Sequence, residues 1–177
     1  MPAEKLIQTI SAQLGTDRVM DKFTALRTYP TEPHFVGPQF LGALRPKDVE
    51  EVQAGIPAAQ EQQTPLYAIS TGNNWGYGAA SPPQSDCILL DLRALNRIRD
   101  FDPLLGVVTV EPGVTQEQLF RFLRDNNHDF LVPVTGAGPA CSIVGNAIER
   151  GYGITPCADH FLAVTNVEAI LADGTMY

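Results

Sequence analysis

Three short apolar runs, separated by one helical stretch and one glycine-rich loop, limit the folds open to this chain. Residues 41–45, 66–70 and 87–92 are each short enough to be a buried strand. Between the first two runs, Val49, Val52 and Ile56 recur on one helical face, and Pro46 with the acidic residues behind it fits the first turn of a helix. This order predicts a β-α-β unit in a parallel sheet with a right-handed crossover.

The pattern changes after Asn96. Residues 97–102 and 107–111 alternate around a turn at residues 103–106, which predicts an antiparallel hairpin. The sequence Thr115-Gln-Glu-Gln is a capping box that opens a helix, and we expect its buried stripe to comprise Leu119, Phe120, Phe122 and Leu123. The chain therefore combines two types of sheet, as in an α+β protein.

The sequence predicts different structures for the two ends of the chain. Residues 3–14 have helical spacing, whereas residues 16–40 have no periodicity and contain several prolines. We therefore assign residues 1–40 to an N-terminal helix followed by an irregular surface segment. The compact domain is assigned to residues 41–177. Residues 162–171 alternate as a strand before an Asp173-Gly174 hairpin turn. Only three residues follow that turn, so we expect the chain to be the N-terminal part of a longer protein.

The composition and net charge limit the kinds of partner that this chain is expected to bind. The 177 residues are 44% apolar and carry a formal charge of -8, which is typical of a globular domain and argues against a nucleic-acid partner. Any bound phosphate must then be met mainly by backbone N–H groups. The sequence has no apolar run long enough to span a membrane and no signal-peptide region, so a cytoplasmic protein without a membrane partner is the expectation.

Cysteines and histidines give no metal-binding pattern. Their spacing lacks a CxxC pair or paired histidines, which argues against a structural zinc site and a disulfide framework. We interpret Cys87 as a small buried apolar residue and expect structural roles for the histidines. The residues concerned are Cys87, Cys141, Cys157, His34, His128 and His160.

Two glycine-rich segments are the candidates for function. The loop at residues 71–83, TGNNWGYGAASPP, follows the second apolar run, and residues 136–161 contain five glycines among polar residues. Successive N–H groups of such a loop can form a concavity for phosphate, although a plain surface turn also needs glycine. A glycine-rich segment of this length inside a domain favours ligand binding over a surface loop.

Four motifs in order carry a family resemblance. They are PKDVEEVQ at residues 46–53, STGNNWGYG at 70–78, VEPGVT at 110–115 and GNAIERGYGITP at 145–156. Together they resemble the vanillyl-alcohol oxidase and p-cresol methylhydroxylase family of FAD-dependent oxidoreductases, over roughly residues 41–177. The resemblance implies two subdomains, a small parallel one and an antiparallel one that is incomplete here, with FAD between them.

The resemblance also nominates residues for the cofactor. In the family the first loop surrounds the FAD pyrophosphate, and the second segment follows the flavin and its ribityl chain. The first set is Thr71, Gly72, Asn73, Asn74, Gly76, Tyr77 and Gly78, and the second is Ser142, Gly145, Asn146, Glu149, Gly151 and Gly153.

This chain departs from the family pattern at positions that concern flavin attachment and substrate binding. Tyr77 stands where many relatives attach FAD through histidine, so that bond is not expected, and Cys141 is interpreted as structural. Phenol-oxidising members use a tyrosine at the position of Tyr77 to bind substrate. At two further positions where such relatives have tyrosine, this chain has Ile154 and Cys157. Tyr77 is thus a candidate for substrate contact, with simple packing beside flavin as the other interpretation.

Other polar residues of the second segment have two interpretations. Asp159 and His160 are adjacent, as a base and its orienting carboxylate would be, although neighbours on an extended chain point to opposite faces, which favours a structural His160. Glu149 and Arg150 are either an ion pair or flavin-lining groups.

The leading hypothesis is the FAD-binding portion of an oxidoreductase that passes hydride from a small organic substrate, such as a para-substituted phenol, to flavin and then electrons to oxygen or a redox protein. The isolated chain is expected to be inactive without the rest of the enzyme. Self-association into a homo-oligomer is also compatible with the sequence. The alternatives are a non-catalytic nucleotide-binding or interaction module, and a glycine-rich structural fragment that binds nothing.

Overall fold

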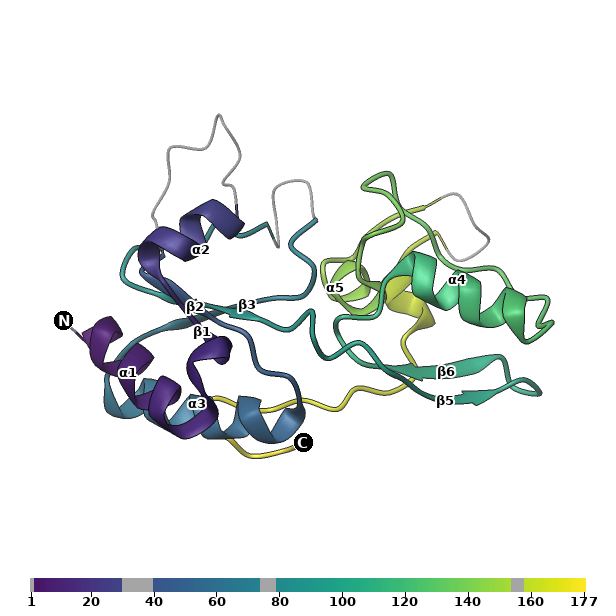
Figure 1. Cartoon of the computed structure of the whole chain (residues 1–177). Coiled ribbons are helices and arrows are strands. Elements are labelled where there is room, and N and C mark those ends of the chain that lie inside the picture. The colour runs from purple at the N-terminus through teal and green to yellow at the C-terminus, as the bar shows by residue number, and fades with distance from the viewer. Residues whose placement is uncertain (1, 30–39, 74–78, 154–157) are drawn as a thin grey trace.

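The computed structural model describes residues 2–29, 40–73, 79–153 and 158–177, which form two lobes (Figure 1). The first lobe contains helices α1 (Pro2–Leu14), α2 (Lys22–Thr28) and α3 (Val49–Glu61), the short helix η1 (Thr16–Arg18), and strands β1 (Val19–Asp21), β2 (Gly42–Leu44), β3 (Leu66–Ile69) and β4 (Ile88–Asp91). The second contains β5 (Ile98–Asp102), β6 (Val107–Val110), α4 (Gln116–Asp125), α5 (Ile143–Ile148) and η2 (His160–Ala163). This arrangement confirms the predicted α+β fold with two subdomains.

The sheet of the first lobe has the order β1-β2-β4-β3. Strand β4 lies between β2 and β3 and is parallel to both, which confirms the predicted β-α-β unit. Helix α3 begins later than expected, because Asp48 is its N-cap and accepts a hydrogen bond from the Glu51 N–H at 2.9 Å. Pro46 therefore precedes the helix instead of lying in its first turn.

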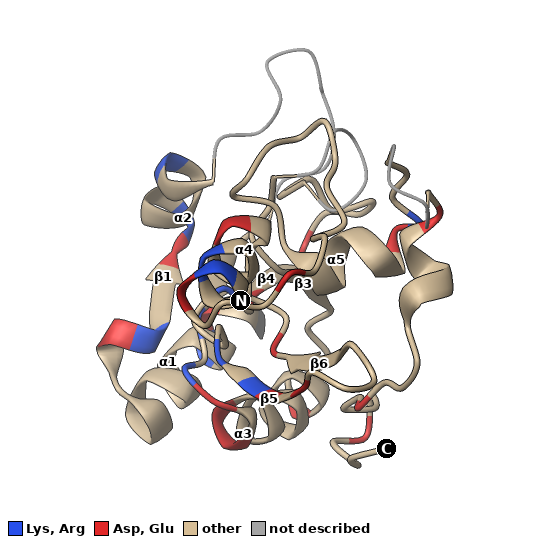
Figure 2. Cartoon of the chain, turned by 90° about the vertical axis from the view of Figure 1, so that its right-hand side faces the viewer, with Lys and Arg blue, Asp and Glu red and all other residues tan. Residues whose placement is uncertain are grey.

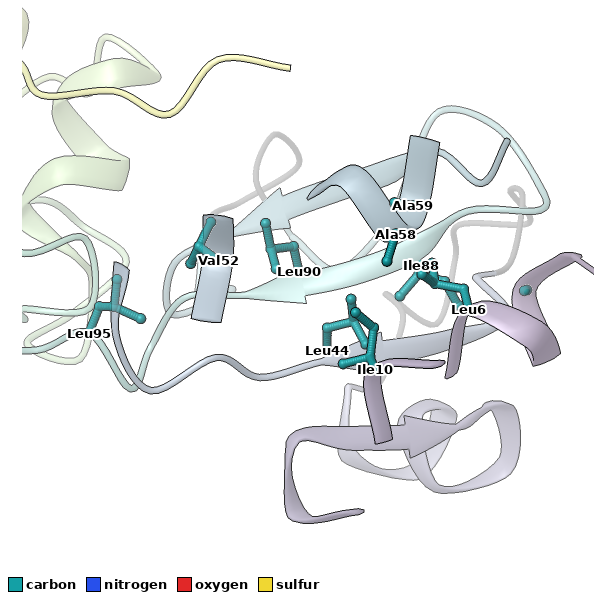
Figure 3. Close-up of a cluster of buried hydrophobic side chains, with 10 residues drawn as sticks. Leu6, Ile10, Leu44, Val52, Ala58, Ala59, Ile88, Leu90 and Leu95 are labelled. Atoms are coloured by element: carbon teal, nitrogen blue, oxygen red, sulfur yellow. The ribbon is translucent and has the colours of Figure 1, made fainter. Parts of the chain in front are cut away.

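Strand β4 is buried throughout because helices cover both faces of the sheet. Ile88 and Leu90 pack with Leu6 and Ile10 of α1 and with Val52 of α3, the cluster drawn in Figure 3. Alternate residues point the other way, so Leu89 packs in a second cluster on the α2 side. In that cluster Cys87 is 1% exposed, as expected for a small apolar residue, and burial raises the pKa of its thiol.

The prediction of an irregular segment over residues 16–40 is wrong for residues 16–28. This part of the chain contains η1, β1 and α2, and β1 pairs antiparallel with β2. Ala25 and Tyr29 are buried, so α2 covers one face of the sheet. Sequence periodicity missed these elements because β1 has only three residues and α2 only seven.

The second lobe contains a two-stranded sheet of β5 and β6, which confirms the predicted hairpin. The capping box at Thr115 and Gln118 is also confirmed. Leu119 and Leu123 are buried in the core of this lobe, with Phe122 packed against it. Phe120 is 54% exposed and lies under Arg124, so its place in the predicted buried stripe is wrong.

The predicted strand over residues 162–171 is also wrong. Its first residues belong to η2, and the ladder reduces to a single bridge between Ile170 and Met176. The Asp173-Gly174 turn is confirmed, because the Gly174 N–H donates to the Leu171 carbonyl at 2.9 Å and Gly174 has φ of +84°. From η2 the chain runs back to α3, where Gln53 donates to the Gly174 carbonyl at 3.1 Å (Figure 1).

Charged residues of both signs are spread over the two lobes. Figure 2 shows short acidic and basic stretches interspersed along the described chain, without a long stripe of one sign in that view. Among the described residues, no helix has the length and apolar character needed to cross a bilayer.

Candidate functional site

The two glycine-rich segments meet at the junction of the lobes. Asn73, four residues beyond the end of β3, donates from its side-chain amide to the Ala140 carbonyl at 3.1 Å. The Cys141 thiol in turn donates to the Asn73 carbonyl at 3.5 Å. Cys141 is buried with its sulfur in this contact, which supports its interpretation as a structural residue. The fold therefore brings together two segments that lie almost 70 residues apart.

A second contact between the same segments explains one glycine. A Cβ atom on Gly145 would lie 2.3 Å from the Ser70 hydroxyl oxygen. No side chain fits that distance without movement, so glycine at position 145 permits the close approach of α5 to the end of β3. Gly72 is needed for a different reason, because its φ of +71° lies in the left-handed region while its Cβ position has room.

Ser142 joins the second segment to the chain between β6 and α4 in the same lobe. Its hydroxyl accepts from the Gly145 N–H at 2.9 Å as the N-cap of α5 and donates to the Pro112 carbonyl at 2.6 Å. The Ile143 N–H also donates to the Val114 carbonyl at 3.0 Å. These bonds join two of the motifs singled out in the sequence, those beginning at residues 110 and 145.

Asn146 and His160 form a buried polar pair beneath the rest of the segment. The Asn146 side-chain oxygen bonds to Nδ1 of His160, so Nδ1 carries the proton and Nε2 is the acceptor nitrogen in the neutral ring. A Cβ on Gly151 would meet the Asn146 amide at 2.1 Å, and one on Gly153 would meet His160 Nε2 at 2.7 Å. Both glycines thus let the chain fold closely over this pair.

Burial lowers the pKa of His160, while the neighbouring Asp159 opposes that shift. The Asp159 carboxylate pairs with Arg150 at 2.8 Å. That carboxylate is therefore not the orienting partner of His160, since Asn146 holds that place. Glu149 is exposed at the C-terminal end of α5, and Arg150 has Asp159 as its ion-pair partner. Of the two interpretations of Glu149 and Arg150, the structure therefore does not support the ion pair between them.

Two buried nitrogen atoms, one within the second segment and one beside it, are suited to a polar ligand. Gln116 Nε2 and His160 Nε2 have no hydrogen-bond partner among the residues that the structure describes. The Gln116 backbone N–H donates to the Cys141 carbonyl, and His160 lies under Gly153. A buried polar atom without a partner is costly, and a bound molecule with hydrogen-bonding groups would satisfy it.

The groups assembled here fit FAD. They are neutral amides, hydroxyls and backbone groups, which match the hydrogen-bonding ribityl chain and flavin, together with a loop containing a left-handed glycine for the pyrophosphate. Of the predicted residues, the structure brings together Thr71, Gly72, Asn73, Ser142, Gly145, Asn146, Gly151 and Gly153, and it leaves Glu149 exposed. Asn74, Gly76, Tyr77, Gly78, Ile154, Cys157 and His34 lie outside the described residues.

Sequence reasoning missed the polar cluster next to Thr71. The fully buried Asp91 ends β4, and Arg93 follows it in the Asp-Leu-Arg sequence at residues 91–93. A carboxylate at the end of an otherwise apolar strand was the available signal, since such a group is rarely buried without a partner. Among the described residues, no group of acidic, histidine and cysteine side chains is arranged to hold a metal ion.

A lobe with a mixed, mainly parallel sheet and a lobe with an antiparallel sheet, joined through two glycine-rich segments, define a nucleotide-cofactor-binding domain. More specifically, the chain belongs to the family of FAD binding domains, which it matches over residues 40–177. FAD is therefore the cofactor of this domain. The family resemblance drawn from the four motifs is confirmed.

Two relatives are similar over 98% of this chain. It is 35% identical to the 1'-carboxy-chondrochloren decarboxylase of Chondromyces crocatus and 34% identical to the flavoprotein subunit of 4-cresol dehydrogenase (hydroxylating) of Pseudomonas putida. The crystal structure of p-cresol methylhydroxylase with substrate bound superimposes on 99% of the chain with a TM-score of 0.91 at 33% identity and is matched over 35% of its own length. The chain spans about a third of each curated relative, 32% and 34% respectively.

Proposed function

We propose that the chain is the FAD-binding portion of a flavin-dependent oxidoreductase that oxidises a small organic substrate of the para-substituted phenol class by hydride transfer to flavin. The observation that carries the proposal is the direct contact between the two glycine-rich segments through Asn73, Ala140 and Cys141. This contact gives one cofactor two walls, one from each lobe. The names of two relatives, a 4-cresol dehydrogenase and a p-cresol methylhydroxylase, support the choice of phenols.

The residues have separate roles in this proposal. The backbone of Thr71, Gly72 and Asn73 meets the pyrophosphate, together with the loop positions Asn74, Gly76 and Gly78. Ser142, Gly145, Asn146, Gly151 and Gly153 shape the wall along the ribityl chain and the flavin. Glu149 is exposed in this structure, so its predicted contact is the least supported of the set.

FAD supplies the hydride acceptor in such an enzyme, and the protein supplies binding, orientation and electrostatics. The neutral lining around Asn146 and His160 suits the uncharged flavin ring, and Gln116 Nε2 and His160 Nε2 provide buried hydrogen-bonding groups beside the wall. Tyr77 is the candidate for contact with the phenol. Oxygen or a redox protein takes the electrons in the complete enzyme.

The test is an absorbance spectrum of the purified protein, before and after acid precipitation, followed by titration of ligand-free protein with FAD. We expect flavin absorbance, release of the flavin into the acid supernatant, and saturable quenching of flavin fluorescence on rebinding. Protein that is colourless and takes up no added FAD would contradict the proposal.

A second measurement separates an oxidoreductase from a non-catalytic FAD-binding module. Anaerobic addition of 4-cresol to the FAD-loaded full-length protein is expected to bleach the flavin absorbance, and the chemically similar 3-cresol serves as the control for the para position. FAD binding without bleaching by any para-substituted phenol would favour the non-catalytic module or a different substrate class.

A further inference from the structure

Four side chains from three segments of the chain converge at the carboxyl end of β4. The centre is Asp91, whose side chain is fully buried. One carboxylate oxygen, Oδ2, accepts from the Tyr29 hydroxyl at 2.5 Å and from Arg45 Nε at 3.0 Å. The other, Oδ1, accepts from both the backbone N–H and Nε of Arg93 at 3.0 Å. We call these four residues the Asp91 cluster.

The Asp91 cluster is positively charged in a chain of formal charge -8. It holds two guanidinium groups against one carboxylate. Burial, together with the bond to Asp91, raises the pKa of Tyr29 to about 12, so its hydroxyl is neutral at pH 7. The two arginine side chains are 31% and 39% exposed, which leaves part of each guanidinium open to solvent or to a ligand.

Sheet register brings this cluster to the phosphate loop. In the parallel pair of β3 and β4, Ile69 lies opposite Asp91. Two residues further along each strand are Thr71 and Arg93, and there Arg93 Nη2 makes a long hydrogen bond of 3.5 Å to the Thr71 carbonyl. The pairing register and the hydrogen bond thus agree on the same neighbours.

The orientation of that carbonyl determines where the next amide points. In a trans peptide the C=O group and the following N–H group point in opposite directions. Because the Thr71 carbonyl faces Arg93, the Gly72 N–H faces away from the cluster, and the left-handed Gly72 then turns the chain. An N–H group presented outward before a left-handed glycine is the kind of donor that anion-binding loops use.

We propose that Arg93, fixed by Asp91, is a positioning residue for the cofactor phosphates: it holds the Thr71–Gly72 peptide with its N–H toward the ligand and adds positive charge behind it. This inference rests on the proposed function, because it takes the loop at Thr71 as the pyrophosphate loop. It also extends the expectation that phosphate is met by backbone donors, since a side chain sets the direction of the donor.

This arrangement requires an arginine because of the shape of the guanidinium group. Its Nε bonds Asp91 while a second nitrogen of the same planar group reaches Thr71, which a single ammonium group does not reproduce. Arg93→Lys therefore keeps the charge and loses the geometry, and Arg93→Gln loses both. Arg121→Gln is the matched control, because Arg121 is exposed and its ion pair with Glu117 lies on α4.

The experiment measures affinity for FAD by fluorescence quenching on ligand-free full-length protein, with ADP and adenosine as competitors. We expect Arg93→Gln to weaken FAD binding roughly tenfold, the effect of one charge-assisted hydrogen bond. Arg93→Lys is expected to weaken binding nearly as much, and Arg121→Gln to bind like the wild type. The preference for ADP over adenosine is expected to fall in both Arg93 variants, which a purely structural role would not produce.

The outcomes separate this inference from the proposed function. Arg93→Lys binding FAD as tightly as the wild type, or an unchanged preference for ADP in both variants, overturns the positioning role. Wild-type protein that binds neither FAD nor ADP overturns the proposed function and this inference with it. Circular dichroism of each variant confirms that the fold is retained, and Arg93→Lys serves as the conservative variant if Arg93→Gln unfolds.

Discussion

Each lobe holds one glycine-rich segment against the other lobe, but the groups that hold them differ. In the first lobe the charged Asp91 cluster anchors the loop at Thr71 to a sheet covered by helices on both faces. In the second lobe the neutral Asn146 and His160 pair supports a short helix and irregular chain. The comparison indicates that the proposed phosphate side is built on charge and paired strands, and the proposed flavin side on close backbone packing.

The largest expected effect comes from removing the charge at the centre of the first lobe. Asp91→Ala leaves Arg45 and Arg93 without their buried counter-charge, which is expected to cost about 3–5 kcal/mol of the free energy of unfolding. Glu117→Ala, which removes an exposed ion pair on α4, is the control and should cost less than about 1 kcal/mol. Urea denaturation followed by circular dichroism measures both. Equal losses in the two variants would contradict a charged anchor in the first lobe.

The second comparison concerns the core of the second lobe. Leu123→Ala removes a buried side chain from its small cluster and is expected to cost about 2–5 kcal/mol. Phe120→Ala, on the exposed side of the same helix, should change stability by no more than about 0.5 kcal/mol. The same denaturation experiment applies, and a greater loss from Phe120 would show that this side chain is covered in solution.

The junction between the lobes gives a sharper test. Gly145→Ala places a Cβ against the Ser70 hydroxyl and is expected to cost about 1–3 kcal/mol. Adding Ser70→Ala should recover much of that loss, because the oxygen that clashes is gone. Gly55→Ala in α3 is the control, since a Cβ there meets Ile10 and Leu44 only at 3.9 and 4.0 Å, and it is expected to be neutral or stabilising. A double-mutant cycle on thermal midpoints reports the coupling, and purely additive effects would argue against this contact.

The smallest expected effect is a pH dependence of stability that comes from His160 in the second lobe. Because the pKa of His160 is lowered in the folded state, the unfolded chain takes up a proton at this residue first as pH falls. Its contribution to stability is therefore complete above the unfolded pKa of about 6.5 and declines as pH falls from there through the folded pKa. The difference in unfolding free energy between wild type and His160→Gln, measured from pH 8 to about pH 5, isolates this effect. A difference that is constant with pH would contradict it.

Sequence patterns located the regular elements of both lobes with the strongest local signals. The alternation around Gly106, the capping box at Thr115 and the turn at Gly174 each depend on residues within a few positions, and all three are present. The pattern failed where tertiary contacts decide the structure. Strand β1 forms because β2 is available to pair with it, whereas residues 162–171 alternate but, among the residues that the structure describes, form only the isolated bridge between Ile170 and Met176.

The site was predictable as two segments but not as a set of contacts. Glycine density and the family motifs identified both segments, whereas the meeting of Ser70 with Gly145 depends on how the lobes pack. The Asp91 cluster joins Tyr29 to Asp91 across 62 positions, so no local spacing shows it. Only the isolated carboxylate at the end of an apolar strand indicated that partners were needed.

The path of the chain between the lobes has a mechanical consequence. The backbone leaves the first lobe after β4 and returns after η2 to lie along α3, where Gln53 and Gln60 bond to the Gly174 and Ala172 carbonyls (Figure 1). Two segments of backbone, one after β4 and one after η2, therefore connect the second lobe to the first. Rotation of the second lobe about either connection strains the other, so the two lobes are expected to keep their relative orientation when a ligand binds or leaves.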